Sequence, residues 1–503
     1  MPAALRGASS RTKKVSPNLT SSSLDGHLTA PGSFINENQT IADQYAVTSQ
    51  QGTSPETQRS MLDSPLSLNG PQSLVDENPH DPVISAEDAF YMERYCYILG
   101  SWFDVFDSAK HFSRVVPHLS LSHPVLRLSV LAWAAKQYYL TNLTQSVDTS
   151  LAYYDRALRM LTASINDIST SSPPAVFASC LLLAISELMG DSYQDWQLHL
   201  EGTYSLVMTH GWHGRSVGLG GACFWIYARM DVLSSLSTAE CSRLSTELWM
   251  PFDDELHIYG LLNTPTVEDW SNQTVFLLAE IHNLLCKVRA GESDEIYNPF
   301  LETWNALKEK IRLHKQRQPI QFKPLAVLEA GDAKDNPFPT KRYLSESVSL
   351  ATQFWNVAQL LFILARPERS RRERSDRYRT EAKTFMTLAK RTVAISVHNR
   401  HEINWVGATQ LLSVTGMAIV DWAERKALLK CLKDVHLRTG WNTLEVIDAL
   451  LAWWGWSTPL NERGQSWTDV HQEIGPYASV SEWMLRMFDC GVVMKAARLS
   501  NQT

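Results

Sequence analysis

The stretch Ser122–Tyr138, SHPVLRLSVLAWAAKQY, decides the fold class of this chain. It opens with the cap-type residue Ser122 and places Pro124 near the first turn, where the missing N–H of proline is harmless. Apolar residues then recur at three- and four-residue spacing, as the buried stripe of a helix requires: Val125, Leu128, Leu131, Ala135 and Tyr138. This pattern predicts a helix with one apolar face.

The same period continues on the C-terminal side of this stretch. Further helices are predicted through Leu151–Ile165, Ala178–Leu188 after the breaker Ser171–Pro174, Trp196–Val207, and Phe224–Leu236. In the second half they are predicted at Val275–Val288, Pro299–Gln316, Ser345–Leu364, Tyr378–His398, Trp405–Lys433 and Trp441–Trp454, with a long connector at Gln316–Pro339. No run shows sustained period-two alternation with hairpin turns. The chain is therefore predicted to be all-α, with one large irregular multi-helix domain over residues 85–500.

Residues 1–84 have a different composition. Residues 1–82 contain 13 Ser, 7 Thr and 8 Pro, with Phe34 and Tyr45 as the aromatic residues. Such a segment buries too little apolar surface to offset its ordering entropy, so a disordered Ser/Thr/Pro-rich tail is predicted. Residues 1–14 carry +4, and residues 15–82 carry one Arg against eight acids, which is -7. The tail fits a solvated leader better than a partner-binding peptide.

The overall composition excludes several functional classes. The 503 residues carry a net charge of -7, whereas binding to nucleic acid through overall charge needs many Lys and Arg contacts to phosphate. The 7 cysteines are scattered without a CxxC pair, which argues against a local zinc finger and a disulfide-dense scaffold. The first residues lack the apolar core of a signal peptide, and no apolar run reaches membrane-spanning length. We expect a chain without membrane association.

Local strings that suggest chemistry have simpler interpretations. Gly214–Gly218 spells GxSxG, but a helix precedes it and no strand feeds Ser216 into the turn that a nucleophile elbow needs. Two histidine sets lack the spacing of a zinc site and are interpreted as core or surface residues: His199, His210 and His213, and His398 and His401. The carboxylates Asp253–Glu255 are interpreted as a solvated turn or helix start. No catalytic, cofactor-binding or metal-binding residue is therefore assigned.

Two basic patches are candidates for nuclear import. The first is Arg11, Lys13 and Lys14 in the tail, and the second is Arg369, Arg371, Arg372 and Arg374. The second patch lies in residues 366–379, where seven arginines and three acids give +4. The alternative interpretation is a charged, exposed loop that leads into the next helix, or a phosphate contact.

Several strings occur in one order over about residues 85–460: His123–Leu126 with Ala134-Ala135, Tyr153–Leu158, Ser186-Glu187 with Asp195–Gly202, Phe224–Val232, Trp270–Asn272 with Trp304, and Trp441–Thr443. Taken together in this order, they resemble one family, the fungal-specific transcription factor domain. This domain is the helical regulatory region of fungal zinc-cluster transcription regulators. The resemblance implies a nuclear, dimer-prone regulator that works with transcription machinery or other regulators.

In the family that this chain resembles, a separate N-terminal Zn₂Cys₆ module reads DNA. Here no cysteine precedes Cys96, so no zinc ligands are carried over. Three explanations fit: the chain lacks the module naturally and reaches DNA through partners, the sequence is missing its first exon, or another element contacts DNA. Zinc is expected as a cofactor only if a cluster is missing from this sequence.

The function predicted from the sequence is a pathway-specific transcriptional regulator rather than an enzyme. An effector or partner that binds the helical domain is expected to change the exposure of regulatory surfaces, including the acidic tail. The first alternative is a helical protein–protein scaffold without direct DNA binding. A hydrolase that uses Ser216 is the third hypothesis.

Overall fold

A computed structural model describes residues 85–142, 146–166, 172–190, 193–249, 265–291, 294–328, 337–455 and 480–490. These residues are helical almost throughout, which confirms the predicted all-α class. The predicted tail, residues 1–84, lies outside the described residues, as do Arg11, Lys13, Lys14 and the carboxylates Asp253–Glu255.

The first half of the described chain is built around the helix that the opening stretch predicts. In order, its elements are α2 (Ala86–Arg94), the π-helix η1 (Tyr95–Leu99), α3 (Gly100–Phe103), η2 (Asp104–Phe106), η3 (His111–Val115), α4 (Val116–Ser122), α5 (Pro124–Thr141), α6 (Asp148–Asn166), α7 (Pro173–Leu188), α8 (Tyr193–His210), α9 (Gly218–Thr238) and α10 (Thr246–Trp249). Helix α5 packs against α6 and α7, and α7 packs against α8 and α9.

The second half is a second group of packed helices. Its elements are α12 (Val267–Ala290), α13 (Asp294–Gln316), η4 (Ile320–Phe322), β1 (Ala326–Leu328), β2 (Thr340–Arg342), α14 (Glu346–Leu364), α15 (Arg371–His398), α16 (Glu402–Gly416), α17 (Trp422–Thr439), α18 (Leu444–Trp454) and α19 (Val480–Cys490). Helix α14 packs against α12, α15 and α16.

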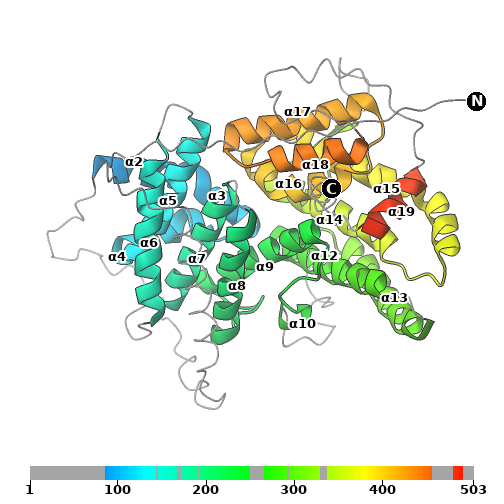
Figure 1. Cartoon of the computed structure of the whole chain (residues 1–503), viewed down its shortest axis with the longest axis horizontal. Coiled ribbons are helices and arrows are strands. Elements are labelled where there is room, and N and C mark those ends of the chain that lie inside the picture. The colour runs from blue at the N-terminus through cyan, green and yellow to red at the C-terminus, as the bar shows by residue number, and fades with distance from the viewer. Residues whose placement is uncertain are drawn as a thin grey trace, which may run out of the picture.

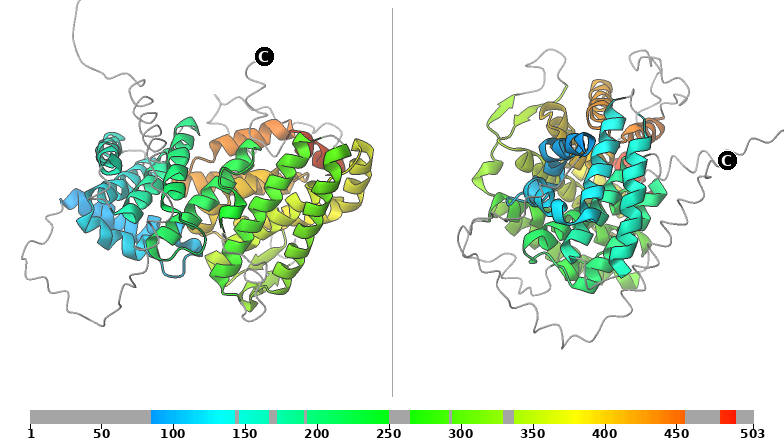
Figure 2. Two further views of the ribbon diagram at one scale, coloured as in Figure 1. Left: turned by 90° about the horizontal axis from the view of Figure 1, so that it is seen from below. Right: turned by 90° about the vertical axis from the view of Figure 1, so that its left-hand side faces the viewer.

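Helix α9 connects the two groups. It contacts α7 and α8 of the first group and α12 and α16 of the second. Figure 1 shows α2–α8 on one side of α9 and α12–α19 on the other, and Figure 2 shows the same division from below. The buried side chains of both groups belong to one continuous cluster, so the two groups share a hydrophobic core.

Helix starts follow the local chemistry of the sequence. Helix α7 begins at Pro173 itself, inside the predicted breaker, because prolines fit the first helical turn. Thr266 and Asp269 form a reciprocal capping box, which starts α12 at Val267 rather than at the predicted Val275. At α5 the N-cap is His123 rather than Ser122, whose hydroxyl donates to the Leu119 carbonyl of the preceding helix.

The predicted helix Trp405–Lys433 is wrong, because the chain forms two helices there. Helix α16 ends at Gly416 and α17 begins at Trp422. Asp421 accepts a hydrogen bond from the Glu424 amide at 3.0 Å and caps the second helix. A Cβ at Gly416 would lie 2.8 Å from Leu428, so the turn brings α17 close to the end of α16.

The predicted connector Gln316–Pro339 also contains regular structure. Strand β1 pairs antiparallel with β2, with Val327 opposite Lys341. The strands are three residues long, too short for the alternation that a period-two search detects.

One described helix, α14, has the length and apolar composition of a membrane span. However, 72% of its apolar window is buried by the rest of the protein. Helix α14 is therefore a central core helix, wrapped by α12, α15 and α16.

Candidate functional site

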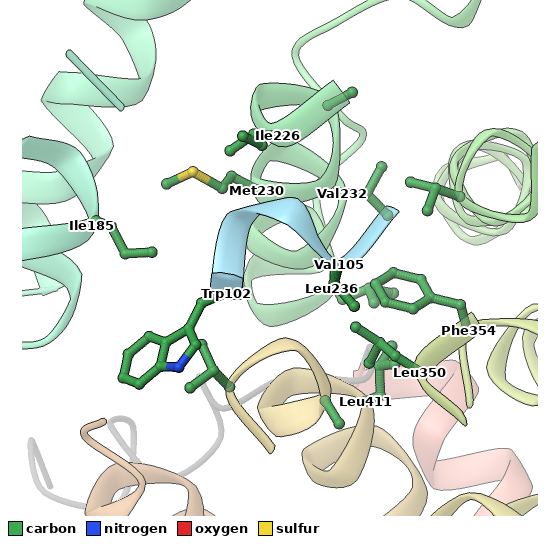
Figure 3. Close-up of a cluster of buried hydrophobic side chains, with 14 of the residues drawn as sticks. Trp102, Val105, Ile185, Ile226, Met230, Val232, Leu236, Leu350, Phe354 and Leu411 are labelled. Atoms are coloured by element: carbon green, nitrogen blue, oxygen red, sulfur yellow. The ribbon is translucent and has the colours of Figure 1, made fainter. Parts of the chain in front are cut away.

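A small apolar cavity lies where the two groups of helices meet. It has a volume of about 70 Å³, and its walls come from α3, η2, α7, α9, α14, α16 and the segment before α18. Figure 3 shows side chains from these helices converging on this junction: Trp102, Ile185, Ile226, Met230, Leu350 and Phe354. A site whose walls come from both groups can couple them, because filling it changes contacts on both sides.

Arg229 of α9 is the charged residue among the lining of this cavity. Its Nη2 donates to the Phe103 carbonyl at 2.9 Å, and its guanidinium lies over the Phe106 ring, 5.2 Å from the centroid. Burial lowers the pKa of Arg229 to about 10, while the charges of Asp107 and Asp104 oppose the shift. None of the ion pairs in the described part of the chain includes Arg229.

A second cavity, of about 300 Å³, lies against the same arginine. Its walls include residues 214–218, Asp107, Glu268 and Asn272. The buried Asn272 Oδ1 accepts no hydrogen bond from the described residues. Arg229 therefore lies between two cavities, with an unused amide acceptor beside the second.

The GxSxG string forms one wall of the second cavity. As predicted, it lies between two helices, α8 and α9, rather than after a strand. The Ser216 hydroxyl accepts a hydrogen bond from the His213 amide at 3.0 Å, so it closes a turn. The glycines of this string are therefore explained by the packing and geometry of the turn between α8 and α9, rather than by a nucleophile elbow.

Replacing Gly221 with Ala is expected to lower the free energy of unfolding by about 1–3 kcal/mol, as overpacking does. A Cβ at Gly221 would overlap the Ser216 carbonyl oxygen, so residues 214–217 must move away from α9. Urea unfolding followed by circular dichroism measures the change. Val217→Ala, at a side chain that is 90% exposed in the same loop, is the control and should change little. Equal stability of Gly221→Ala and wild type would contradict this packing.

The third cavity, of about 520 Å³, is basic. It lies between β2, the end of α15, the start of α16 and α17, and its charged and titratable lining residues are Arg342, His398, Arg400, His401, Lys430 and Asp434. Burial lowers the pKa of His398, and the positive charges of Arg342 and Arg400 lower it further. The two histidines of the second predicted set thus line one cavity, together with more basic than acidic side chains.

Three arginines of the Arg-rich patch, Arg371, Arg372 and Arg374, lie in a helix, and Arg369 lies just before it. Helix α15 begins at Arg371, seven residues before the predicted start at Tyr378, because Ser370 caps it by accepting from the Glu373 amide. Arg371 forms an ion pair with Asp489 of α19 at 2.7 Å, and Arg374 lies 3.7 Å from the centroid of the Phe488 ring.

Two arginines of this patch therefore contact helix α19. Arg369 and Arg372 are exposed, and Arg369 lies over the Tyr297 ring. The assignment of Arg369, Arg371, Arg372 and Arg374 to nuclear import stays a prediction.

The first histidine set is dispersed in the core and its margin. His199 is buried, with its Nε2 2.8 Å from the Tyr154 hydroxyl. Burial lowers the pKa of His210 and of His213, and Arg215 adds to the effect at His213. Across the described residues, no three His, Cys, Asp or Glu side chains come together as metal ligands would.

The sequence does not indicate where the cavities lie. It contains Arg229 only as part of the string Phe224–Val232, and it assigns no role to this residue. The cavity walls come from segments more than 300 residues apart, from Trp102 to Trp441. No residue spacing within one helix indicates such a site. The one local indication is that Arg229 is a charged residue within a helix whose neighbouring residues are apolar.

Comparison with known proteins identifies the family of the helical body. A family model described as fungal specific transcription factor domain matches residues 90–481. The chain is also 20% identical to the transcription activator AMTR1 of Alternaria alternata, in an alignment that covers 72% of this chain and 62% of that relative. The chain thus spans less than two thirds of that relative's length. No solved structure matches the chain significantly. Because the family model matches well over half of the chain, from within α2 to the start of α19, the chain belongs to the fungal specific transcription factor domain family.

Proposed function

We propose that this protein is a transcriptional regulator that acts in the nucleus on the genes of one pathway. The observation that carries the proposal is the family match over residues 90–481, which includes both groups of helices and the cavities between them. The similarity to a transcription activator supports it. The helical body is the regulatory part, and it reaches DNA through partners or through a separate module.

The cavity beside Arg229 is the part of the body that we assign to an effector. Its walls are apolar, and Arg229, Ser234 and Gln410 supply the polar groups. Apolar walls with a few placed polar groups are typical of sites for small molecules. At about 70 Å³ the cavity is smaller than such sites, so an effector must move the two groups of helices apart to enter it. A ligand with a carbonyl or carboxylate would accept from Arg229, and its apolar part would fill the junction of α7, α9, α14 and α16.

The activity is tested by fusing the full chain to a heterologous DNA-binding domain upstream of a reporter gene in a fungal host. We expect reporter expression to differ at least several-fold from that with the DNA-binding domain alone. Deletion of the gene should change a small set of transcripts, and a fluorescent fusion should accumulate in the nucleus. A cytosolic fusion with cytoplasmic partners and an unchanged reporter would favour the scaffold instead.

Arg229→Met in the same fusion tests the assigned cavity. Methionine keeps an unbranched apolar side chain, although it is shorter than arginine, and it removes the charge and the hydrogen bond to the Phe103 carbonyl. The substitution breaks none of the ion pairs in the described part of the chain, so it leaves no opposite charge of such a pair behind. We expect normal protein levels with altered reporter output. Arg156→Met, at an exposed position on α6, is the matched control and should behave as wild type. Identical reporter output from both variants would argue against a role for the cavity.

A further inference from the structure

A short segment after α9 crosses the side of α12. Residues 239–244, called the strap here, begin at Ala239, whose φ of 58° is in the left-handed region that a non-glycine residue seldom adopts. The Ser242 amide donates to Asn283 Oδ1 at 2.9 Å, and the Leu244 amide donates to Asp231 Oδ2 at 2.9 Å. The strap is thus held to α12 on one side and to α9 on the other.

Two thiols lie at the crossing of the strap and α12. Cys286, on α12, is buried and donates from Sγ to the Ala239 carbonyl at 3.4 Å. Cys241, on the strap, is exposed and reaches back to the Asn283 carbonyl with its Sγ at 3.9 Å. Each sulfur therefore contacts the backbone of the other segment, and Cys241 lies close enough to Cys286 to raise the pKa of its thiol.

The surroundings give the two thiols different reactivity. Burial, and next the neighbouring Cys241, raise the pKa of Cys286 to about 12, so this thiol stays protonated and shielded. Cys241 is the thiol open to solvent, where small oxidants reach it. His282 Nε2 donates to the Glu240 carbonyl at 2.9 Å and lies 3.5 Å from the Cys286 sulfur.

We propose that Cys241 and Cys286 are a modification site, at which a hydroperoxide oxidises the pair to a reversible intramolecular disulfide. The Cys241 thiolate attacks one oxygen of hydrogen peroxide, the O–O bond breaks, and hydroxide leaves and takes up a proton to form water. Cys241 is then a sulfenic acid. The Cys286 sulfur attacks the Cys241 sulfur, the S–O bond breaks, and the departing hydroxide takes the Cys286 proton as a second water. The two thiols together supply the two electrons.

The other described cysteines do not offer such a pair. Cys180, Cys223 and Cys431 are buried, and Cys96 is half-buried. Cys180 lies close enough to Cys223 to raise its pKa, but both side chains are almost fully buried in the core. Among the cysteines whose side chains the structure describes, only the pair at the strap combines an exposed thiol with a buried neighbour, which is the arrangement of an attacking and a resolving cysteine.

The disulfide would join the end of α9 to α12. The cross-link would restrict the unfolded chain, so the oxidised protein should unfold at a higher temperature than the reduced protein. Both helices also border the second cavity, through Arg229 of α9 and Asn272 of α12. Oxidation would therefore add a covalent link between two elements that form walls of this cavity.

The test uses the purified full chain, treated with a few equivalents of hydrogen peroxide. The protein is then alkylated in denaturant and digested without reductant for mass spectrometry. We expect a peptide cross-linked through Cys241 and Cys286, its loss on dithiothreitol treatment, and a higher midpoint of thermal unfolding before that treatment. Cys96→Ser is the control and should leave the cross-link unchanged. The outcome does not depend on the proposed function, because no DNA or reporter enters the measurement.

Two variants separate the steps. Cys286→Ala should accumulate a sulfenic acid at Cys241 that dimedone traps. Cys241→Ser, at an exposed position where the fold tolerates change, should leave Cys286 reduced and alkylated. The proposal is overturned if Cys286 stays fully alkylated in oxidised wild type, if Cys241 instead pairs with another cysteine or another copy of the chain, or if Cys241→Ser leaves the oxidation of Cys286 unchanged.

Discussion

Replacing Trp133 with Ala is expected to lower the free energy of unfolding by about 3–5 kcal/mol, the usual loss for a buried large aromatic residue. Trp133 of α5 is fully buried, and its ring lies 5.1 Å from that of Phe103 and 5.9 Å from that of Trp102. Its Nε1 donates to the Met189 sulfur at 3.2 Å. Truncation therefore leaves a cavity where α3, α5 and α7 meet.

Guanidinium or urea unfolding, followed by tryptophan fluorescence and circular dichroism, measures this loss. Tyr97→Ala is the control, because that aromatic side chain is 80% exposed and its removal should change stability by less than about 0.5 kcal/mol. A loss below about 1 kcal/mol for Trp133→Ala would mean that the helices do not pack around this ring. The same substitution should also loosen the packing of the apolar cavity, because Trp102 and Phe103 contact the Trp133 ring and line that cavity.

Acidification from pH 8 to pH 5 is expected to cost about 4 kcal/mol through His282 and His314, about 2 kcal/mol each, because each unit of pKa difference is worth about 1.4 kcal/mol. Burial lowers the pKa of His282 to about 4 and that of His314 to about 3. In the unfolded chain both titrate near about 6.5. The unfolded state therefore binds protons first as the pH falls, so the stability present above pH 6.5 is lost below it.

The geometry of His314 explains its resistance to protonation. Its ring stacks on Trp270 with centroids 4.4 Å apart, and its Nε2 lies 2.8 Å from the Thr274 hydroxyl. That hydroxyl donates to the Trp270 carbonyl, so Nε2 carries the proton and donates to Thr274. Within the described part of the chain the buried Nδ1 has no partner. A second proton would place an unsatisfied charged N–H in the core.

Four buried carboxyls oppose this trend. Burial raises the pKa of Asp104, Asp231, Glu280 and Glu424, so falling pH relieves the cost of their charge. The histidine effect is isolated by comparing variants over the same pH range. His314→Phe keeps the ring stacked on Trp270, and we expect it to lose about 2 kcal/mol less than wild type between pH 8 and pH 5. His401→Phe, at a side chain that is 61% exposed, is the control. Parallel pH curves for wild type and His314→Phe would refute the assignment.

Much of the fold was predictable, because helix formation depends on nearby residues. The position of α5 and the start of α14, predicted at Ser345 and found at Glu346 after the N-cap Ser345, follow from spacing and capping chemistry. The predicted single apolar face of α5 is wrong, because neighbouring helices bury α5 on nearly all sides between Val125 and Gln137. The errors also have local causes. Gly416 ends α16, and Asp421 caps the start of α17. Because the period of 3.6 residues continues on both sides of this turn, the sequence predicts one helix instead of two.

The sequence by itself determined the helical class, the approximate helix positions and the family resemblance, because each depends on residues close together in the chain. Only the tertiary structure decided that Arg229 lies between two cavities and that Cys241 meets Cys286. It also decided that Arg371 pairs with Asp489 of α19. These arrangements depend on how helices that are distant in the sequence pack together. Helical periodicity indicates which face of a helix is buried, but it does not indicate which other helix covers that face.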